Sequence, residues 1–226
     1  MSRLLVLASA SPRRRELLAR LGLPFVVVPS GADEDAPDGA DPRHLARRLA
    51  VGKARAVWAS RGPDACVLGA DTVVAADDSG RRRVLGKPAD PAEARAMLDL
   101  LSGATHTVYT GVALVTCGPG GRPLARSAVA ATRVAFRALT EAEVDAYLLT
   151  DEPWDKAGGY GVQGLASAFV EAVEGDYYNV MGLPLACVRL LLLPHYPAVL
   201  PAPSAPHVPF ALRGGAPCEP GEPAPA

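Results

Sequence analysis

A short apolar run, a loop of small residues and a helix start together constrain the fold more than any other stretch. Leu4–Ala8 has the length and composition of a buried β-strand. Ser11 and Pro12 suit the N-cap and the first position of a helix that ends by Gly22. This order of elements directs free backbone N–H groups at whatever lies above the loop. The chain therefore starts with an α/β unit that can bind an anion.

Three arginines, Arg13, Arg14 and Arg15, fall in the first turn of that helix. Cations at this end oppose the helix dipole, so a helix that merely faces solvent would more naturally carry acidic residues there. One interpretation is a set of solvated charges. The other, which we favour, is an anion bound at the loop, because a guanidinium suits phosphate oxygens.

Length and composition restrict the class of protein. The chain has 226 residues, 49% of them hydrophobic, and a net charge of −1, so it has no basic field for nucleic acid. No stretch reaches the roughly 18 apolar residues of a membrane span, and the first apolar run is too short for a secretory signal. The four cysteines form no C-x-x-C pair, so we expect neither a zinc site nor disulfides, but reduced thiols in a cytoplasmic protein.

Periodicity and turn residues predict strands and helices in mixed order, which indicates an α/β (mixed α+β) fold with one continuous core. Strands are expected at 4–8, 25–28, 65–70, 73–76, 84–85, 106–115, 127–137 and 168–173. Helices are expected at 12–21, 42–60, 92–101, 141–149 and 183–193. Residues 151–164 are rich in glycine and read as an irregular loop.

The composition changes at Pro194. Ten of the last 33 residues are proline and only three are charged, which suits neither a helix nor a central strand. We therefore divide the chain into a domain at 1–193 and a proline-rich tail at 194–226, predicted to be extended or disordered.

One lysine is placed unusually. Leu45, Leu49, Lys53 and Val57 recur every four residues along the helix predicted at 42–60, so Lys53 falls on its apolar face. A lysine on the buried side is costly unless it is paired. The alternative is that its side chain reaches outward to solvent.

Two glycine-containing motifs do not support their usual interpretation. Gly159–Gly164 matches G-x-G-x-x-G, but a polar loop precedes it and a strand follows, so it is no dinucleotide fingerprint. Gly80–Lys87 resembles a phosphate-binding loop with the wrong spacing, and Pro88 stands where Ser or Thr would be needed.

The remaining acids and cations fit magnesium-dependent attack on a polyphosphate. Asp33 and Glu34 lie in a loop, and Asp71 follows the strand predicted at 65–70. Carboxylates hold a hard cation and can activate water, while Lys53, Lys87 and Lys156 can neutralise phosphate oxygens. Each of these residues, taken alone, has a simpler structural explanation, since acidic residues in loops are usually solvated and Asp71 could cap a helix.

Ordered motifs over about residues 3–193 resemble those of the Maf family. They are Ser11-x-Arg13-Arg14-x-Glu16, Asp33-Glu34, Lys53-Ala54, Gly69-Ala70-Asp71-Thr72-Val73-Val74, Gly86-Lys87-Pro88, Leu101-Ser102-Gly103-x-x-His106, Asp155–Gly164 and Tyr178–Pro184.

The resemblance implies a nucleoside triphosphate pyrophosphatase that releases a nucleoside monophosphate and pyrophosphate, in house-cleaning of the nucleotide pool. It implies an inosine-triphosphatase-like fold of two lobes, with an elongated mixed sheet flanked by helices and a central cleft. It also implies a divalent cation, Mg²⁺ or Mn²⁺, and a homodimer. Asp71 would accept the proton, with Lys53 and Lys87 catalytic. Ser11, Arg13, Arg14 and Lys156 would bind phosphate, and Asp33, Glu34 and Asp71 would hold the metal.

Within that family the sequence is similar to the branch that acts on dTTP and UTP. Arg13, Thr72 and Gln163 would be the specificity positions, and a glutamine offers the donor and acceptor that suit a pyrimidine edge. Two alternatives stay open. One is the sister branch that acts on methylated guanosine triphosphate. The other is a non-catalytic nucleotide-binding regulator of cell division.

Overall fold

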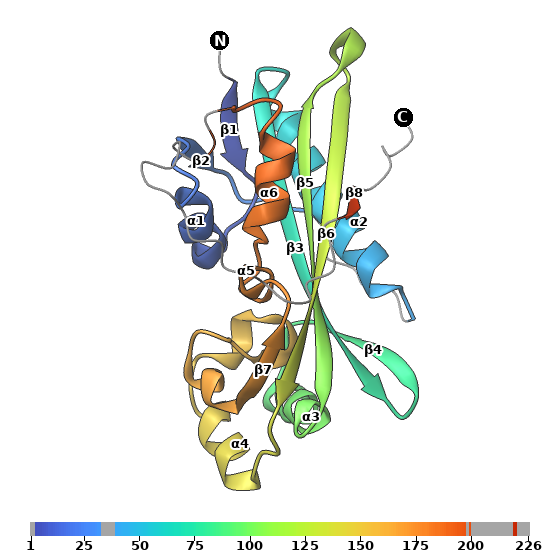
Figure 1. Ribbon diagram of the computed structural model, residues 1–226, viewed down its shortest axis with the longest axis vertical. Coiled ribbons are helices and arrows are strands. Elements are labelled where there is room, and N and C mark those ends of the chain that lie inside the picture. The colour runs from blue at the N-terminus through green and yellow to red at the C-terminus, as the bar shows by residue number, and fades with distance from the viewer. Residues whose placement is uncertain (1–2, 33–38, 198, 200–218, 221–226) are drawn as a thin grey trace, which may run out of the picture.

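Three long antiparallel strands run the length of the molecule. They are β3 (Ala65–Asp78), β5 (Thr105–Cys117) and β6 (Pro123–Phe136). Fourteen residues of strand extend roughly 45 Å, so these strands pass through both lobes of the molecule (Figure 1). The computed structural model describes residues 3–32, 39–197, 199 and 219–220.

Shorter strands complete one mixed sheet. β1 (Leu4–Leu7) pairs in parallel with β2 (Phe25–Val27) and with β3, and β7 (Val170–Glu174) pairs antiparallel with β6. β4 (Arg81–Leu85) forms a hairpin with the second half of β3, and β8 (Glu219–Pro220) pairs with β6. The mixed α/β class predicted from the sequence is confirmed.

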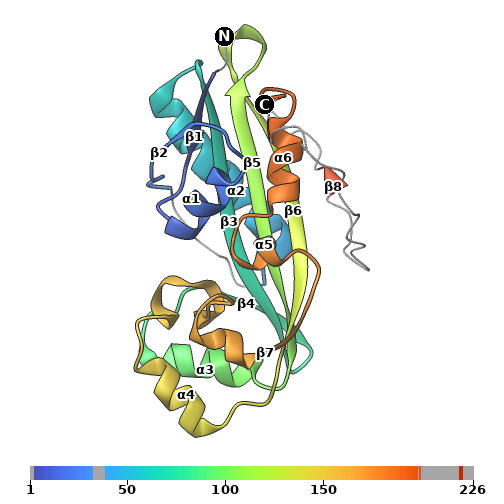
Figure 2. The same cartoon turned by 60° about the vertical axis from the view of Figure 1, so that its left-hand side comes forward.

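Helices cover both faces of the sheet and form the second lobe. α2 (Pro42–Arg61) packs on one face, and α1 (Pro12–Ala19), α5 (Tyr177–Val180) and α6 (Leu185–Leu192) pack on the other. These elements with β1 and β2 form the first lobe. α3 (Pro91–Leu101), α4 (Glu141–Leu148) and β7 gather at the opposite end as the second lobe (Figures 1 and 2).

Helix starts follow the local sequence signals. Ser11, Asp41 and Asp90 each cap a helix whose first residue is proline, and Thr140 forms a capping box with Glu143. Short-range chemistry therefore fixes where four of the predicted helices begin.

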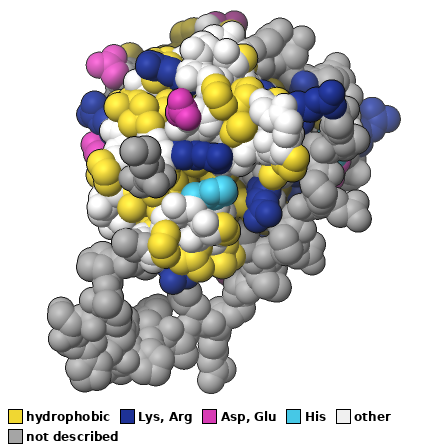
Figure 3. Space-filling model, turned by 90° about the horizontal axis from the view of Figure 1, so that it is seen from above, with side chains coloured by type: hydrophobic (Ala, Val, Ile, Leu, Met, Phe, Trp, Pro, Cys, Tyr) yellow, Lys and Arg dark blue, Asp and Glu magenta, His cyan; other side chains and the backbone are white. Residues whose placement is uncertain are grey.

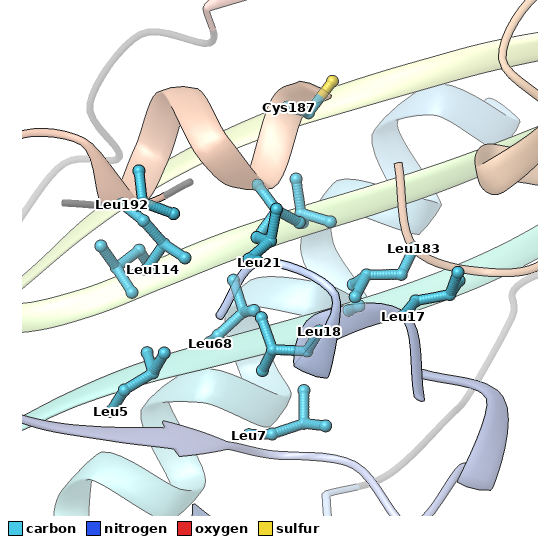
Figure 4. Close-up of a cluster of buried hydrophobic side chains, with 14 of the residues drawn as sticks. Leu5, Leu7, Leu17, Leu18, Leu21, Leu68, Leu114, Leu183, Cys187 and Leu192 are labelled. Carbon is cyan, nitrogen blue, oxygen red and sulfur yellow. The ribbon is translucent and has the colours of Figure 1, made fainter. Parts of the chain in front are cut away.

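Each lobe has its own hydrophobic core. The first-lobe cluster is rich in leucine and joins β1, β3 and β5 to α1 and α6 (Figure 4). It includes Leu5, Leu7, Leu17, Leu18, Leu21, Leu68, Leu114, Leu183, Cys187 and Leu192. The second-lobe cluster contains Phe136, Tyr147, Tyr160 and Phe169 in edge-to-face contact. The continuous sheet holds the two cores together, so the hydrophobic interior is divided and is not the one continuous core expected from the sequence.

α2 lies unusually close to the sheet, because glycines face it. A Cβ at Gly69 of β3 would lie 2.4 Å from the Ala50 carbonyl oxygen, and one at Gly111 of β5 would lie 2.2 Å from that of Ala46. Small residues on both sides therefore set the distance between helix and sheet.

The structure corrects three further expectations. β3 is one strand from residue 65 to 78, so Asp71 lies within it and not at a strand end, because pairing with β5 continues through this position. α5 and the short 3-10 helices Pro153–Asp155, Ala157–Gly159 and Leu165–Phe169 were not predicted, since such short turns carry little periodicity. Cys66 and Cys117 are free thiols as expected, whereas Cys187 is disulfide-bonded, because sequence spacing does not say which sulfurs the fold brings together.

Part of the predicted tail packs on the first lobe. The Tyr196 hydroxyl donates to the Arg3 carbonyl oxygen at 2.8 Å, and both Tyr196 and Val199 are buried. Most of the tail lies outside the described residues, so its disorder stays a prediction.

The surface agrees with the near-neutral composition. Figure 3 looks onto one end of the molecule and shows hydrophobic side chains interspersed with lysine and arginine. Among the helices that the structure describes, none has the length and apolar character to cross a membrane.

Replacing Gly111 by alanine should destabilise the fold by about 3 kcal/mol, because the new methyl group would overlap the α2 backbone. Gly52→Ala is the matched control. Gly52 is exposed within α2 with open space around it, and alanine there should stabilise by about 0.5–1 kcal/mol. Urea unfolding of both variants checks this, and wild-type stability of Gly111→Ala would contradict it.

Candidate active site

A cavity of about 630 Å³ opens between the two lobes. Its volume suits a ligand the size of a nucleotide. The predicted site residues that the structure describes all line it, although they come from separate parts of the chain: Ser11, Arg13, Arg14, Lys53, Asp71, Thr72, Lys87, Lys156 and Gln163. Asp33 and Glu34 lie outside the described residues.

The cleft forms where the edge of β3 is interrupted. β1 pairs with β3 over Ala65–Leu68, and β4 pairs with it over Val74–Asp78. Between these two stretches, none of the described strands pairs with β3 on that edge. The chain leaves β1 there and enters α1. As a result, side chains from both faces of β3 reach the same cleft.

Asp71 and Lys53 form a buried ion pair on the α2 side of the sheet. The Lys53 ammonium donates to the Asp71 carboxylate, and the two residues are 6% and 7% exposed. The interpretation in which Lys53 reaches outward is therefore wrong. Removing one partner of such a pair leaves an unpaired buried charge and costs about 3–5 kcal/mol. The pair thus fixes a carboxylate on the cleft wall.

Arg14 is held on the opposite face of the sheet. Its Nε donates to the Gly182 carbonyl oxygen at 2.8 Å, and its Nη2 donates to Thr72 Oγ1 at 3.0 Å. A longer contact of 3.4 Å joins Nη1 to Ser9 Oγ. Oxygen acceptors thus fix a guanidinium that the dipole of α1 alone would disfavour.

The second lobe contributes charged residues to the facing wall. Arg13 of α1 bridges to Asp155 across the cleft at 3.1 Å, and Lys156 Nζ donates to the Glu152 carbonyl oxygen at 2.7 Å. Burial opposes ionisation of Asp155, but Lys156 and Arg13 outweigh it and lower the pKa of that carboxyl group. Lys87, on the segment that follows β4, completes this set of cations.

Glu152 is a structural residue of the site that the sequence reasoning missed. Its carboxylate accepts backbone N–H groups of Leu165 at 2.7 Å and Ala166 at 3.2 Å, and the Tyr147 hydroxyl at 3.1 Å. A Cβ at Gly164 would lie 2.0 Å from this carboxylate. The glycine pattern at residues 159–164 therefore lets a loop pass close to Glu152, and has nothing to do with dinucleotide binding.

A buried histidine supports the same loop from behind. His106 is 2% exposed, and its Nε2 lies 2.7 Å from the hydroxyl of Tyr160, which lines the cleft. Burial lowers the pKa of His106 to about 4 and raises that of Tyr160. His106 is therefore neutral near pH 7.

The described residues offer only part of a metal site. Asp71, Glu152 and Asp155 are the described acids that line the cleft, and carboxylate oxygens are the ligands that Mg²⁺ and Mn²⁺ prefer. Within the described part of the chain, no three His, Cys, Asp or Glu side chains gather closely enough to hold a metal ion. Asp71 as a ligand, with Asp33 and Glu34, therefore stays a prediction.

Comparison with known proteins identifies the relatives of this chain. The family described as Maf-like protein matches residues 4–194. A dTTP/UTP pyrophosphatase from Moorella thermoacetica is 55% identical over 190 residues, which cover 83% of this chain and 93% of that protein. Proteins of the same name from Deinococcus radiodurans and Symbiobacterium thermophilum are 54% and 50% identical, over 83% and 85% of this chain and 90% and 95% of theirs.

One solved structure shows limited similarity to this chain. It is a nucleoside-triphosphatase, dITP/XTP pyrophosphatase, from Mycobacterium abscessus, with a TM-score of 0.36 and 20% identity over 60% of this chain and 74% of that chain.

Stability should fall as the pH drops from about 6.5 towards 4. The pKa of His106 is lower in the folded protein than its ordinary value of 6.5, so the unfolded state binds a proton first. The stability that depends on a neutral His106 is fully present above pH 6.5. Its loss should total about 3 kcal/mol near pH 4. Urea unfolding measured across this pH range should show that the free energy of unfolding depends less steeply on pH for His106→Gln than for wild type. The same dependence on pH in variant and wild type would contradict the prediction.

Proposed function

The chain belongs to the Maf-like protein family, and from that premise we propose that it hydrolyses dTTP and UTP to the nucleoside monophosphate and pyrophosphate. Modified pyrimidine triphosphates belong to the same proposal, as part of house-cleaning of the nucleotide pool. The observation that carries it is the convergence on one cleft of the buried Lys53–Asp71 pair with Arg14, Lys87 and Lys156.

Asp71 is the residue best placed to accept a proton from an attacking water. It lies on the cleft wall, and Lys53 fixes the orientation of its carboxylate. A positioned general base of this kind typically accelerates a reaction by about 10²–10⁴-fold. Cleavage between the α- and β-phosphates then requires that the triphosphate be held with its α-phosphorus towards this carboxylate.

Cationic side chains around the cleft can bind the triphosphate in this orientation. Arg14 enters the cleft from the first lobe, and Lys87 and Lys156 line it from the opposite side. Arg13 and Lys156 both form ion pairs with Asp155. A triphosphate carries more negative charge than one carboxylate, so it can replace Asp155 as their partner. Ser11 caps α1, and it lines the same space together with Pro12 and Arg13 of the first helical turn.

A divalent cation is part of the proposal. Asp71 would hold Mg²⁺ or Mn²⁺ together with Asp33 and Glu34, and the bound ion would neutralise phosphate oxygens. Carboxylate oxygens suit such an ion, and Asp71 is the described member of that set which lines the cleft.

Arg13, Thr72 and Gln163 are the proposed specificity residues. All three line the cleft from different elements. Gln163 lies in the glycine-rich loop, where its amide can offer one donor and one acceptor to a pyrimidine. A base that leaves these groups unpaired would bind less well. Assembly as a homodimer and a cytoplasmic location stay predictions.

A substrate panel tests the proposal. With Mg²⁺, the protein should release pyrophosphate from UTP and dTTP at least about tenfold more efficiently than from GTP or a methylated guanosine triphosphate. Chelation of the metal should abolish release. Preference for the methylated purine would favour the sister branch, and UTP binding without turnover would favour a non-catalytic regulator.

Asp71→Asn should lower kcat for pyrophosphate release by at least about a hundredfold, because the amide cannot accept the proton. The asparagine keeps an oxygen for Lys53 but not the counter-charge, so circular dichroism should show a folded protein that is less stable than wild type. Asp77→Asn is the control, since Asp77 is exposed on the same strand outside the cleft. If Asp71→Asn turned over UTP at the wild-type rate, the assignment of the base would be refuted.

A further inference from the structure

A buried hydroxyl lies directly behind the cleft wall. Thr110 of β5 is 0% exposed and pairs in register with Thr72 of β3. The two hydroxyl oxygens are 2.9 Å apart, and Thr110 Oγ1 lies 3.0 Å from the backbone carbonyl oxygen of Asn179. Thr110 does not line the cleft, and neither the ion pair nor the phosphate contacts proposed above involve it.

The number of hydrogens fixes the direction of these bonds. A carbonyl oxygen can only accept, so the single hydroxyl hydrogen of Thr110 goes to Asn179. The bond between the two threonines must then use the hydrogen of Thr72. Thr72 therefore directs its hydrogen into the sheet and offers lone pairs to the guanidinium of Arg14, which donates to it at 3.0 Å.

The far end of this chain of bonds is rigid. Asn179 is 0% exposed, and its side-chain nitrogen donates to the Val108 carbonyl oxygen and to Thr132 Oγ1, both at 2.9 Å. Thr132 in turn donates to the Asp176 carbonyl oxygen at 3.0 Å. Two strands and α5 thus hold the carbonyl group on which the order of hydrogens depends.

We propose that Thr110 is a positioning residue that acts through Thr72 to hold Arg14 in its substrate-binding orientation. This rests on the proposed function, in which Arg14 grips phosphate. Without the Thr110 hydroxyl, the Thr72 hydrogen loses the one acceptor that the described residues give it. The Thr72 hydroxyl can then turn its hydrogen towards Arg14, where it opposes the guanidinium, instead of presenting a lone pair to it. Arg14 lies at the unfavourable end of the α1 dipole, so each correctly oriented acceptor helps to hold its guanidinium in place.

Three variants separate this role from a general effect on folding. Thr110→Val keeps the shape but removes the hydroxyl, and it should raise KM for UTP by about tenfold while kcat changes less than threefold. Thr110→Ser restores the hydroxyl and should restore the wild-type KM. Thr116→Val is the control, because Thr116 is also buried on the same face of β5 but lies outside the cleft, and its KM should be unchanged.

A double-mutant cycle provides the decisive measurement. If Thr110 acts through Arg14, then Thr110→Val should change KM little further once Arg14 is already alanine. A merely structural role would raise KM equally in both backgrounds, and that result would overturn the proposal. A wild-type KM in Thr110→Val, or the same rise in Thr110→Ser, would overturn it too.

A substitute variant and a wild-type control complete the test. If Thr110→Val does not fold, Thr110→Ala removes the same hydroxyl from a smaller side chain, and the same outcomes apply to it. Wild-type protein is assayed alongside. Absence of pyrophosphate release from wild type refutes the proposed function, whereas an active wild type with an unaffected Thr110 variant refutes only the role of Thr110.

Discussion

The close packing of α2 against the central sheet is the constraint on which the site depends. Gly69 and Gly111 have no side chain to separate the helix from the strands, and alanines face them from α2. This proximity lets Lys53 reach Asp71 in the protein interior. A buried lysine is costly alone and so is a buried aspartate, but each satisfies the other here. Backbone packing thus creates the charged centre of the cleft.

The interrupted edge of β3 is the second requirement. Because successive residues of a strand point to opposite faces, Asp71 and Thr72 could not share a pocket in the middle of a sheet. They share one here because β1 stops before them and β4 starts after them. The loop from β1 then carries α1 and its arginines into the opening. One interruption in strand pairing therefore joins groups from both faces of the sheet.

Several local preferences are violated at this place. Arginines occupy the positive end of a helix dipole, a lysine is buried, and an aspartate lies within a strand. Such conflicts between local preference and global fold are expected at functional sites. Glu152 and His106 stabilise the opposite wall through their contacts with Leu165 and Tyr160.

The sequence by itself determined the helix starts, the mixed order of elements and the identity of the chemical groups. Caps and periodicity act over a few residues, so Ser11, Asp41 and the apolar-face position of Lys53 could be read directly. Only the tertiary structure decided that Asp71 lies within a strand, that Lys53 is its partner and that Thr110 stands behind Thr72. These facts depend on strand register and on the distance between a helix and a sheet, and such contacts join residues far apart in the chain, about which local patterns carry no information.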